Sequence, residues 1–132
     1  MIEWSDRYLT GISSIDHQHE RLFAFCNSLE QRLQKGEGRA LVKEGLSFLE
    51  TYIEVHFGAE DLCMVRDACP LASQNRRAHQ AFIDRFGSLK TELRSSADPA
   101  ETLILFHKHL ERWIGEHILR IDVSLRGCLE DF

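Results

Sequence analysis

Four of the seven histidines in this 132-residue chain lie on apolar stripes that repeat at intervals of three and four residues. These four, His19, His56, His79 and His117, belong to four different segments. The interval is that of one face of an α-helix, so each imidazole is predicted to point into a helical core. Because a buried polar group without a partner costs about 1–3 kcal/mol, these side chains need something to bind. Glu60 lies four residues after His56 and adds a carboxylate on the same face.

The order of the segments predicts that these side chains converge. In an antiparallel bundle the start of the first helix, the end of the second, the start of the third and the end of the fourth lie together, and the four histidines occupy those places. A single histidine on an apolar face is more often a hydrogen-bonded core residue. Four of them on four helices indicate a metal centre, because the charge of the ion offsets the desolvation of its ligands. The spacing alone leaves zinc as an alternative to iron.

Two further polar residues lie near the same end. Asn75 extends the third stripe, four residues before His79. Asp122 lies five residues after His117, which is about 140° of rotation on an ideal helix. Periodicity therefore places Asn75 on the inward face but assigns no role to Asp122.

Four long segments carry the stripes, and short breaks rich in glycine, serine or proline separate them. The segments lie near residues 15–34, 39–65, 73–94 and 99–122. Because short connections favour antiparallel neighbours, the sequence predicts an all-α fold, an up-down-up-down antiparallel four-helix bundle. An irregular N-terminal leader, residues 1–14, precedes it, and the rings of Trp4 and Tyr8 are expected to pack over the helices.

Local signals mark two helix starts. Asp98 fits the N-cap of the last helix, and Glu101 fits the reciprocal position of a capping box. Ser73 is a candidate cap for the third helix. These signals place the breaks but carry no chemistry of their own.

Composition and charge exclude several other classes. With 43% hydrophobic residues, 28% charged residues and two prolines, residues 1–132 fit a single globular domain rather than a disordered chain or a turn-rich β sandwich. The net charge is −5 without any run of five basic residues, so neither nucleic acid nor an anionic membrane is an expected partner.

No apolar stretch reaches membrane-spanning length and no targeting segment is evident, so we expect a cytoplasmic location. The four cysteines form no C-x-x-C pair, and we expect reduced, at least partly buried thiols.

A series of short sequence pieces extends from the leader to the end of the last helix. They are Trp4, Tyr8, Thr10-Gly11-Ile12, Ile15-Asp16-His17-Gln18-His19, His56-Phe57-Gly58-Ala59-Glu60, Met64, His79, Trp113-Ile114-Gly115-Glu116-His117-Ile118 and Asp122. In order and spacing they resemble the hemerythrin family, especially its bacterial members. The resemblance implies two iron ions (Fe2+/Fe3+) in a four-helix bundle, bridged by two carboxylates and an oxo or hydroxo group. Dioxygen or small anions would bind at this non-haem centre.

The resemblance also implies individual roles. Glu60 and Asp122 look like the bridging carboxylates. The ligands of the oxygen-binding iron would be His19 and His56, and those of the other iron would be His79 and His117. By the same resemblance, an apolar set lines the oxygen pocket. Its members are Leu22, Phe57, Trp113, Ile114 and Ile118.

One position departs from the family pattern. The third helix of the family usually offers two histidines four residues apart, but Asn75 stands at the first of these positions. An amide oxygen is a much weaker iron ligand than imidazole, so Asn75 either binds weakly or leaves a vacancy. We expect easier access for water or small anions and faster oxidation of the reduced form, which suit a sensor better than a carrier.

The remaining histidines are interpreted as surface residues. His107 and His109 flank Lys108 on what resembles a polar face, more than a turn and a half from His117. His17 lies two residues before His19 and therefore nearly opposite it. None of the three is expected to fill the position of the missing ligand.

These observations favour one function over three others. The preferred hypothesis is a di-iron oxygen-binding or redox-sensing domain that regulates a fused output domain such as a diguanylate cyclase. A free oxygen store or carrier is the alternative. A di-iron enzyme is disfavoured because no Glu-x-x-His motif is present, and we expect no catalytic activity. Zinc binding is the fourth hypothesis.

Overall fold

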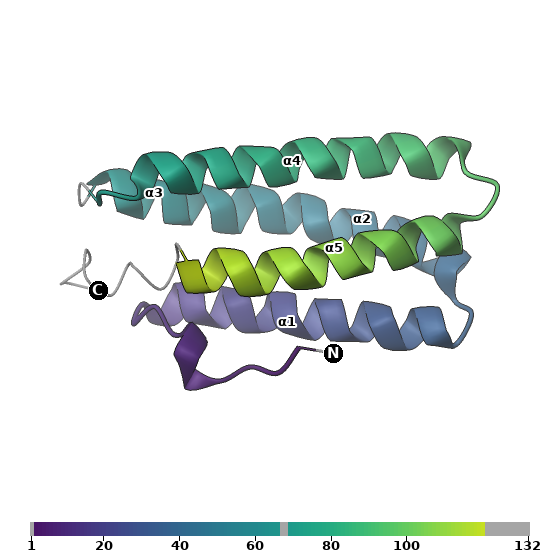
Figure 1. Ribbon diagram of the computed structural model, residues 1–132, viewed down its shortest axis with the longest axis horizontal. Helices are drawn as coiled ribbons and strands as arrows, with labels where there is room; N and C mark the ends of the chain where they lie inside the picture. Colours follow the sequence, from purple (N-terminus) through teal and green to yellow (C-terminus); the bar gives the residue numbers. More distant parts are fainter. Residues whose placement is uncertain (1, 67–68, 121–132) are drawn as a thin grey trace.

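The computed structural model of the chain describes residues 2–66 and 69–120. It contains four long helical rods, one of them built from three consecutive elements, after a short 3-10 helix in the leader. The elements are η1 (Asp6–Tyr8), α1 (Ser13–Gln34), α2 (Gly38–Tyr52), η2 (Ile53–Phe57), α3 (Gly58–Arg66), α4 (Ala72–Ser95) and α5 (Pro99–Arg120). The α1–α2 and α4–α5 connections lie at one end of the bundle, and the α3–α4 connection lies at the other (Figure 1). The predicted antiparallel four-helix bundle is confirmed.

The second rod differs from the prediction of one uninterrupted α-helix over 39–65. Its middle, Ile53–Phe57, is a π-helix. Such single wide turns are uncommon in α-helices and are found most often at functional sites. Here the wide turn contains His56 and directly precedes the helix that contains Glu60.

Helix starts agree with the sequence signals at one of two places. The carboxylate of Asp98 accepts a hydrogen bond from the backbone N–H of Glu101 (3.3 Å), as an N-cap does. The backbone N–H of Asp98 donates to the Ser96 hydroxyl instead of to Glu101 (3.1 Å). The prediction that Ser73 caps α4 is wrong, because α4 begins at Ala72 with Leu71 at the N-cap position.

The leader is fixed against α1 by rings and by one buried carboxylate. Trp4 and Tyr8 both pack edge-on against Phe23, with ring centroids 5.2 and 4.9 Å away, as predicted for these rings. Asp16 of α1 accepts hydrogen bonds from the backbone N–H and the hydroxyl of Thr10 (2.7 and 2.8 Å). These contacts hold the leader close to the start of α1, one turn before His19.

The apolar core extends along the bundle and has two parts. The larger cluster draws on η1 and on all four rods, with members such as Leu29, Leu49 and Leu110. A smaller cluster lies at the end where the α3–α4 connection is found. It contains Ile12, Ile15, Met64 and Cys69. A site between the two clusters is therefore bounded by apolar side chains on both sides.

Two glycines shape the opposite end. Gly36, in the α1–α2 connection, has a φ of 78°, which favours glycine over residues with a side chain. Gly38 begins α2, and a Cβ added there would lie 2.6 Å from the Cβ of Ala100. Only glycine therefore lets the starts of α2 and α5 approach this closely.

Among residues 2–66 and 69–120, no helix combines the length and apolar character that a membrane crossing requires.

We expect Leu110→Ala to lower the free energy of unfolding by about 2–5 kcal/mol, because it leaves a cavity where the parent side chain is 0% exposed. The matched control is Leu105→Ala on the same helix, where the side chain is 57% exposed and the change should stay within about 0.5 kcal/mol. Urea unfolding followed by circular dichroism measures both. Equal losses in the two variants would contradict the assignment of the α5 core face.

Candidate metal centre

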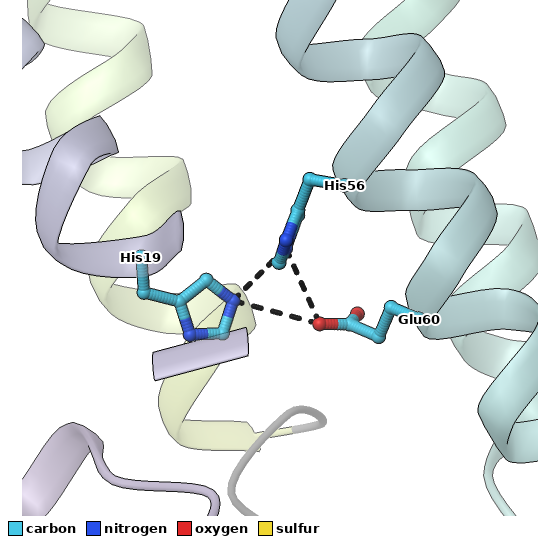
Figure 2. Close-up of side chains that lie close together, drawn as sticks. All are labelled: His19, His56 and Glu60. Atoms are coloured by element: carbon cyan, nitrogen blue, oxygen red, sulfur yellow. Dashed lines mark hydrogen bonds and ion pairs between the residues drawn. The ribbon is translucent and has the colours of Figure 1, made fainter. Parts of the chain in front are cut away.

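Three buried side chains meet at the end of the bundle next to the smaller apolar cluster. Figure 2 shows His19 of α1 facing His56 and Glu60 of the second rod. The Nε2 atoms of His19 and His56 lie 3.0 Å apart. They lie 3.5 and 3.3 Å from Oε2 of Glu60. One carboxylate oxygen and two imidazole nitrogens therefore face a common point.

A second pair of imidazoles approaches the same carboxylate from its other oxygen. The Nε2 atoms of His79 (α4) and His117 (α5) lie 3.2 Å apart. Their distances to Oε1 of Glu60 are 3.1 and 4.0 Å. Glu60 thus directs one oxygen toward each histidine pair, which is the arrangement of a carboxylate that bridges two ions.

The spacing of the nitrogens fits metal coordination. Two nitrogens bound to one ion at about 2.1 Å and at a right angle to each other lie about 3 Å apart. The two Nε2–Nε2 distances, 3.0 and 3.2 Å, match that value. The donor atoms, imidazole nitrogen and carboxylate oxygen, suit iron as well as zinc. The residues present therefore fit a pair of transition-metal ions.

Burial makes the electrostatics of Glu60 unusual. Its side chain is 0% exposed. Burial alone would raise its pKa, but the close imidazole nitrogens of His19, His56 and His79 outweigh that effect and hold the pKa well below the usual range. Glu60 is therefore negatively charged in the folded protein, and it attracts cations into an apolar surrounding.

Two polar residues outside the predicted set hold the imidazoles from behind. Nδ1 of His56 lies 2.5 Å from the side-chain oxygen of Gln18, and Nδ1 of His79 lies 3.1 Å from the carboxylate of Asp61. Such partners fix which ring nitrogen faces the site, here Nε2, and set the orientation of the ring. Both residues are off the inward stripes, so helical periodicity could not find them. Their only sequence signal is that each adjoins a predicted ligand.

Aromatic rings restrict the imidazoles further. Phe57 stacks on His79 with ring centroids 3.9 Å apart and planes 3° from parallel. Trp113 stacks on His117 at 4.4 Å and 10°. With one face covered and Nδ1 hydrogen-bonded, His79 has little freedom to rotate.

Asn75 lies on the inward face of α4, as predicted, and is fully buried. Its amide nitrogen donates a hydrogen bond to the carboxylate of Asp61 (3.0 Å). Its amide oxygen has no hydrogen-bond donor among the residues that the structure describes. The amide is therefore held by its nitrogen, and its oxygen is the atom left for a ligand.

The apolar residues assigned to an oxygen pocket are part of the main core. Four of the five, Leu22, Phe57, Ile114 and Ile118, are buried, and Trp113 is partly buried against them. Two of the five contact histidines directly: Phe57 stacks on His79, and Trp113 stacks on His117. Their role as a pocket lining stays a prediction.

The predictions for the three remaining histidines can be compared with the structure. Asp122 lies outside the described residues. His17 is exposed, as predicted, and His109 is partly exposed. The prediction that His107 is a surface residue is wrong, because its side chain is 8% exposed. It lies four residues after Leu103 and three before Leu110, so it belongs to the apolar face of α5.

The fold and the site together define a class: a helical bundle whose inward imidazoles and shared carboxylate could hold two metal ions. Independent support comes from sequence comparison. The family model described as the hemerythrin HHE cation binding domain matches residues 10–125. The chain belongs to the hemerythrin family, whose domains bind a di-iron centre and dioxygen.

Individual relatives agree with this assignment. The chain is 29% identical to the bacteriohemerythrin of Stenotrophomonas maltophilia (strain R551-3) over 118 residues, which is 89% of this chain and 74% of the relative. It is 29% identical to the bacteriohemerythrin of Pseudomonas aeruginosa (strain LESB58) over 121 residues, or 92% and 76%. The hemerythrin-like protein of Naegleria gruberi is 24% identical over 126 residues, or 96% and 92%.

The contact between His79 and Asp61 generates a pH prediction for the metal-free protein. Burial lowers the pKa of His79, but Asp61 and Glu60 outweigh burial and raise it from 6.5 to about 9. Because the folded state binds this proton more tightly than the unfolded chain, the stabilisation is complete below pH 6.5 and is lost as the pH rises through about 9. Asp61→Asn should shift the pKa of His79 downward, as read by an NMR titration of its imidazole.

The control for that titration is Asp84→Asn, which removes an exposed carboxylate from α4, the helix that contains His79. It should leave the pKa of His79 unchanged. Identical titration curves for all three proteins would show that Asp61 does not hold the proton of His79.

Proposed function

We propose that this domain binds its two irons through His19, His56, His79, His117, Glu60 and Asp122. The main supporting observation is that the two oxygens of the Glu60 carboxylate face two different pairs of histidines. When bound, the two irons supply reversible one-electron chemistry and positions at which dioxygen or small anions can bind. An oxo or hydroxo group and the carboxylate of Asp122 would complete the bridge that Glu60 begins.

The chain's own residues then have distinct tasks. His19 and His56 hold the iron that offers dioxygen a position, and His79 and His117 hold its partner. Gln18 and Asp61 fix the two rings that they contact, so that Nε2 is the coordinating atom. Leu22, Phe57, Trp113, Ile114 and Ile118 exclude water from the site, which limits the release of reduced oxygen species.

The amide at Asn75 favours a sensing function over oxygen storage. With an amide in place of a histidine, each iron would be held by two imidazoles, and Asn75 would add at most a weak amide ligand beside His79 and His117. A site with this extra lability suits detection of oxygen or of redox state better than long-term storage. We therefore propose a sensing domain, and a free oxygen store or carrier is the alternative.

The output of such a sensor would lie in another domain. We propose that residues 1–132 form one input domain and that it regulates a fused output domain such as a diguanylate cyclase. The domain itself is proposed to be non-catalytic. A cytoplasmic location stays a prediction from the sequence.

Replacing the shared carboxylate should disrupt both metal positions. We expect Glu60→Gln to reduce the iron content from two ions per chain to well below one, because the bridge and its charge are lost together. Elemental analysis of anaerobically reconstituted protein measures this loss. The control is Glu54→Gln, an exposed residue of the same rod. Full iron loading of Glu60→Gln, or equal loss in the control, would contradict the assignment of Glu60 as the bridge.

Restoring the second histidine of α4 tests the sensing argument. We expect Asn75→His to slow oxidation of the reduced protein by air several-fold, because the added imidazole fills the labile position. Stopped-flow absorbance in the near ultraviolet follows the reaction. Gln74→His, at an exposed neighbouring position, is the control and should oxidise at the parent rate. An unchanged rate in Asn75→His would remove the reason to prefer a sensor over a carrier.

A further inference from the structure

A second cluster of metal-binding side chains lies between α1 and α5, apart from the histidine centre. Cys26 comes from α1, and His107 and Glu111 come from α5. One donor atom of each side chain, a sulfur, a nitrogen and an oxygen, lies within 4.8 Å of the other two. Cys26 is 0% exposed and His107 is 8% exposed.

This cluster is distinct from the di-iron centre. Cys26 lies seven residues after His19, which is about 10 Å along α1. Glu111 lies six residues before His117, about 9 Å along α5 in the same direction. Both helices place the cluster near the middle of the bundle, and no residue is shared between the two sites.

The imidazole of His107 is the feature that calls for a ligand. Its side chain is nine-tenths buried, and the nearest carboxylate oxygen, on Glu111, is 3.7 Å from Nε2. That distance is too long for a hydrogen bond, and Nε2 has no hydrogen-bond partner among the residues that the structure describes. A buried ring nitrogen in this state is stabilised by binding an ion.

An opening from the surface reaches the cluster. A cavity of ≈ 380 Å³ between α1 and α5 is lined by His107 and Glu111, together with Glu30, Leu33, Ile104 and Lys108. Cys26 does not line this cavity, but its sulfur lies within 4.8 Å of the donor atoms of His107 and Glu111, which do. An ion that enters from solvent therefore meets His107 and Glu111 first, with the sulfur of Cys26 within 4.8 Å of both.

The charges around Cys26 also favour a cation. Burial, followed by the nearby carboxylates of Glu111 and Glu30, raises the pKa of the Cys26 thiol to about 12. The same two carboxylates that oppose a thiolate attract a divalent ion. Such an ion stabilises the thiolate directly, because a metal-bound thiol is deprotonated.

We propose that Cys26, His107 and Glu111 bind one divalent ion of the zinc type. Binding forms a metal–sulfur bond, and the thiol proton leaves to solvent through the cavity. Sulfur, nitrogen and oxygen donors in this combination are typical zinc ligands, and three protein ligands leave the fourth position open to water. The ion would connect α1 to α5 in the middle of the bundle.

Co²⁺ is the probe, because its thiolate complexes absorb in the near ultraviolet through sulfur-to-metal charge transfer. The 132-residue chain is first loaded with iron, and Co²⁺ is then titrated while the iron content is monitored. We expect one Co²⁺ per chain beyond the iron, with a charge-transfer band. Cys26→Ser should abolish the band, whereas Cys69→Ser, at another buried cysteine, should keep it.

A second variant avoids the core. Glu111 is only partly buried, so Glu111→Gln should fold normally while it removes the anionic ligand. We expect a loss of Zn²⁺ affinity of at least about tenfold, since even residues outside the ligand set change affinity by about 10–100-fold. Zn²⁺ should also raise the Tm of the iron-loaded parent but not that of Glu111→Gln. The exposed Glu92→Gln is the control.

Three outcomes would overturn the proposal: no Co²⁺ beyond the iron, a band that survives Cys26→Ser, or parent-like Zn²⁺ affinity in Glu111→Gln. Each can occur with the iron content intact. Failure of this site is therefore distinguishable from failure of the di-iron assignment.

Discussion

The buried carboxylate of Glu60 is the charge on which the arrangement of the bundle depends. It has no exposed surface, and imidazoles from all four rods lie within 4.0 Å of its two oxygens. A lone carboxylate in this position would be strongly unfavourable. The four histidines make the burial tolerable, and a pair of cations does so more completely. Each rod must therefore hold its own imidazole at the same depth.

Packing and hydrogen bonding fix that depth and the orientation of the rings. The smaller apolar cluster closes the bundle on one side of the centre, and the main core lies on the other. Gln18 and Asp61 hold the outer nitrogens of two imidazoles, and Phe57 and Trp113 cover the faces of two. The centre is thus preorganised by residues that carry no metal themselves, as is common at metal sites.

Helical periodicity was sufficient to predict the bundle and the inward direction of the four histidines, Glu60 and Asn75. It was insufficient where side chains act across elements. Asp61 contacts His79 and Asn75 from a neighbouring helix, and no intra-helix spacing encodes such a contact. Nor does periodicity reveal the π-helix at Ile53–Phe57, because the apolar stripe continues through it.

His107 shows a different limit of sequence reasoning. Its neighbour Lys108 indicated a polar face, whereas its own spacing from Leu103 and Leu110 matched the apolar stripe. The ring is 8% exposed, as the stripe predicts and the neighbouring lysine does not. Adjacent residues lie about 100° apart on a helix, so the charge of Lys108 does not define the face on which His107 lies.

The position of the centre at one end of the bundle also determines where the chain can change length. The connections at the opposite end, residues 35–37 and 96–98, are separated from the imidazoles by most of the length of a rod (Figure 1). Extra residues there can loop out without rotating any helix. One residue inserted inside α5 before His117 would instead turn that imidazole by about 100° away from Glu60. Insertions and deletions that preserve the centre should therefore concentrate in these distal loops.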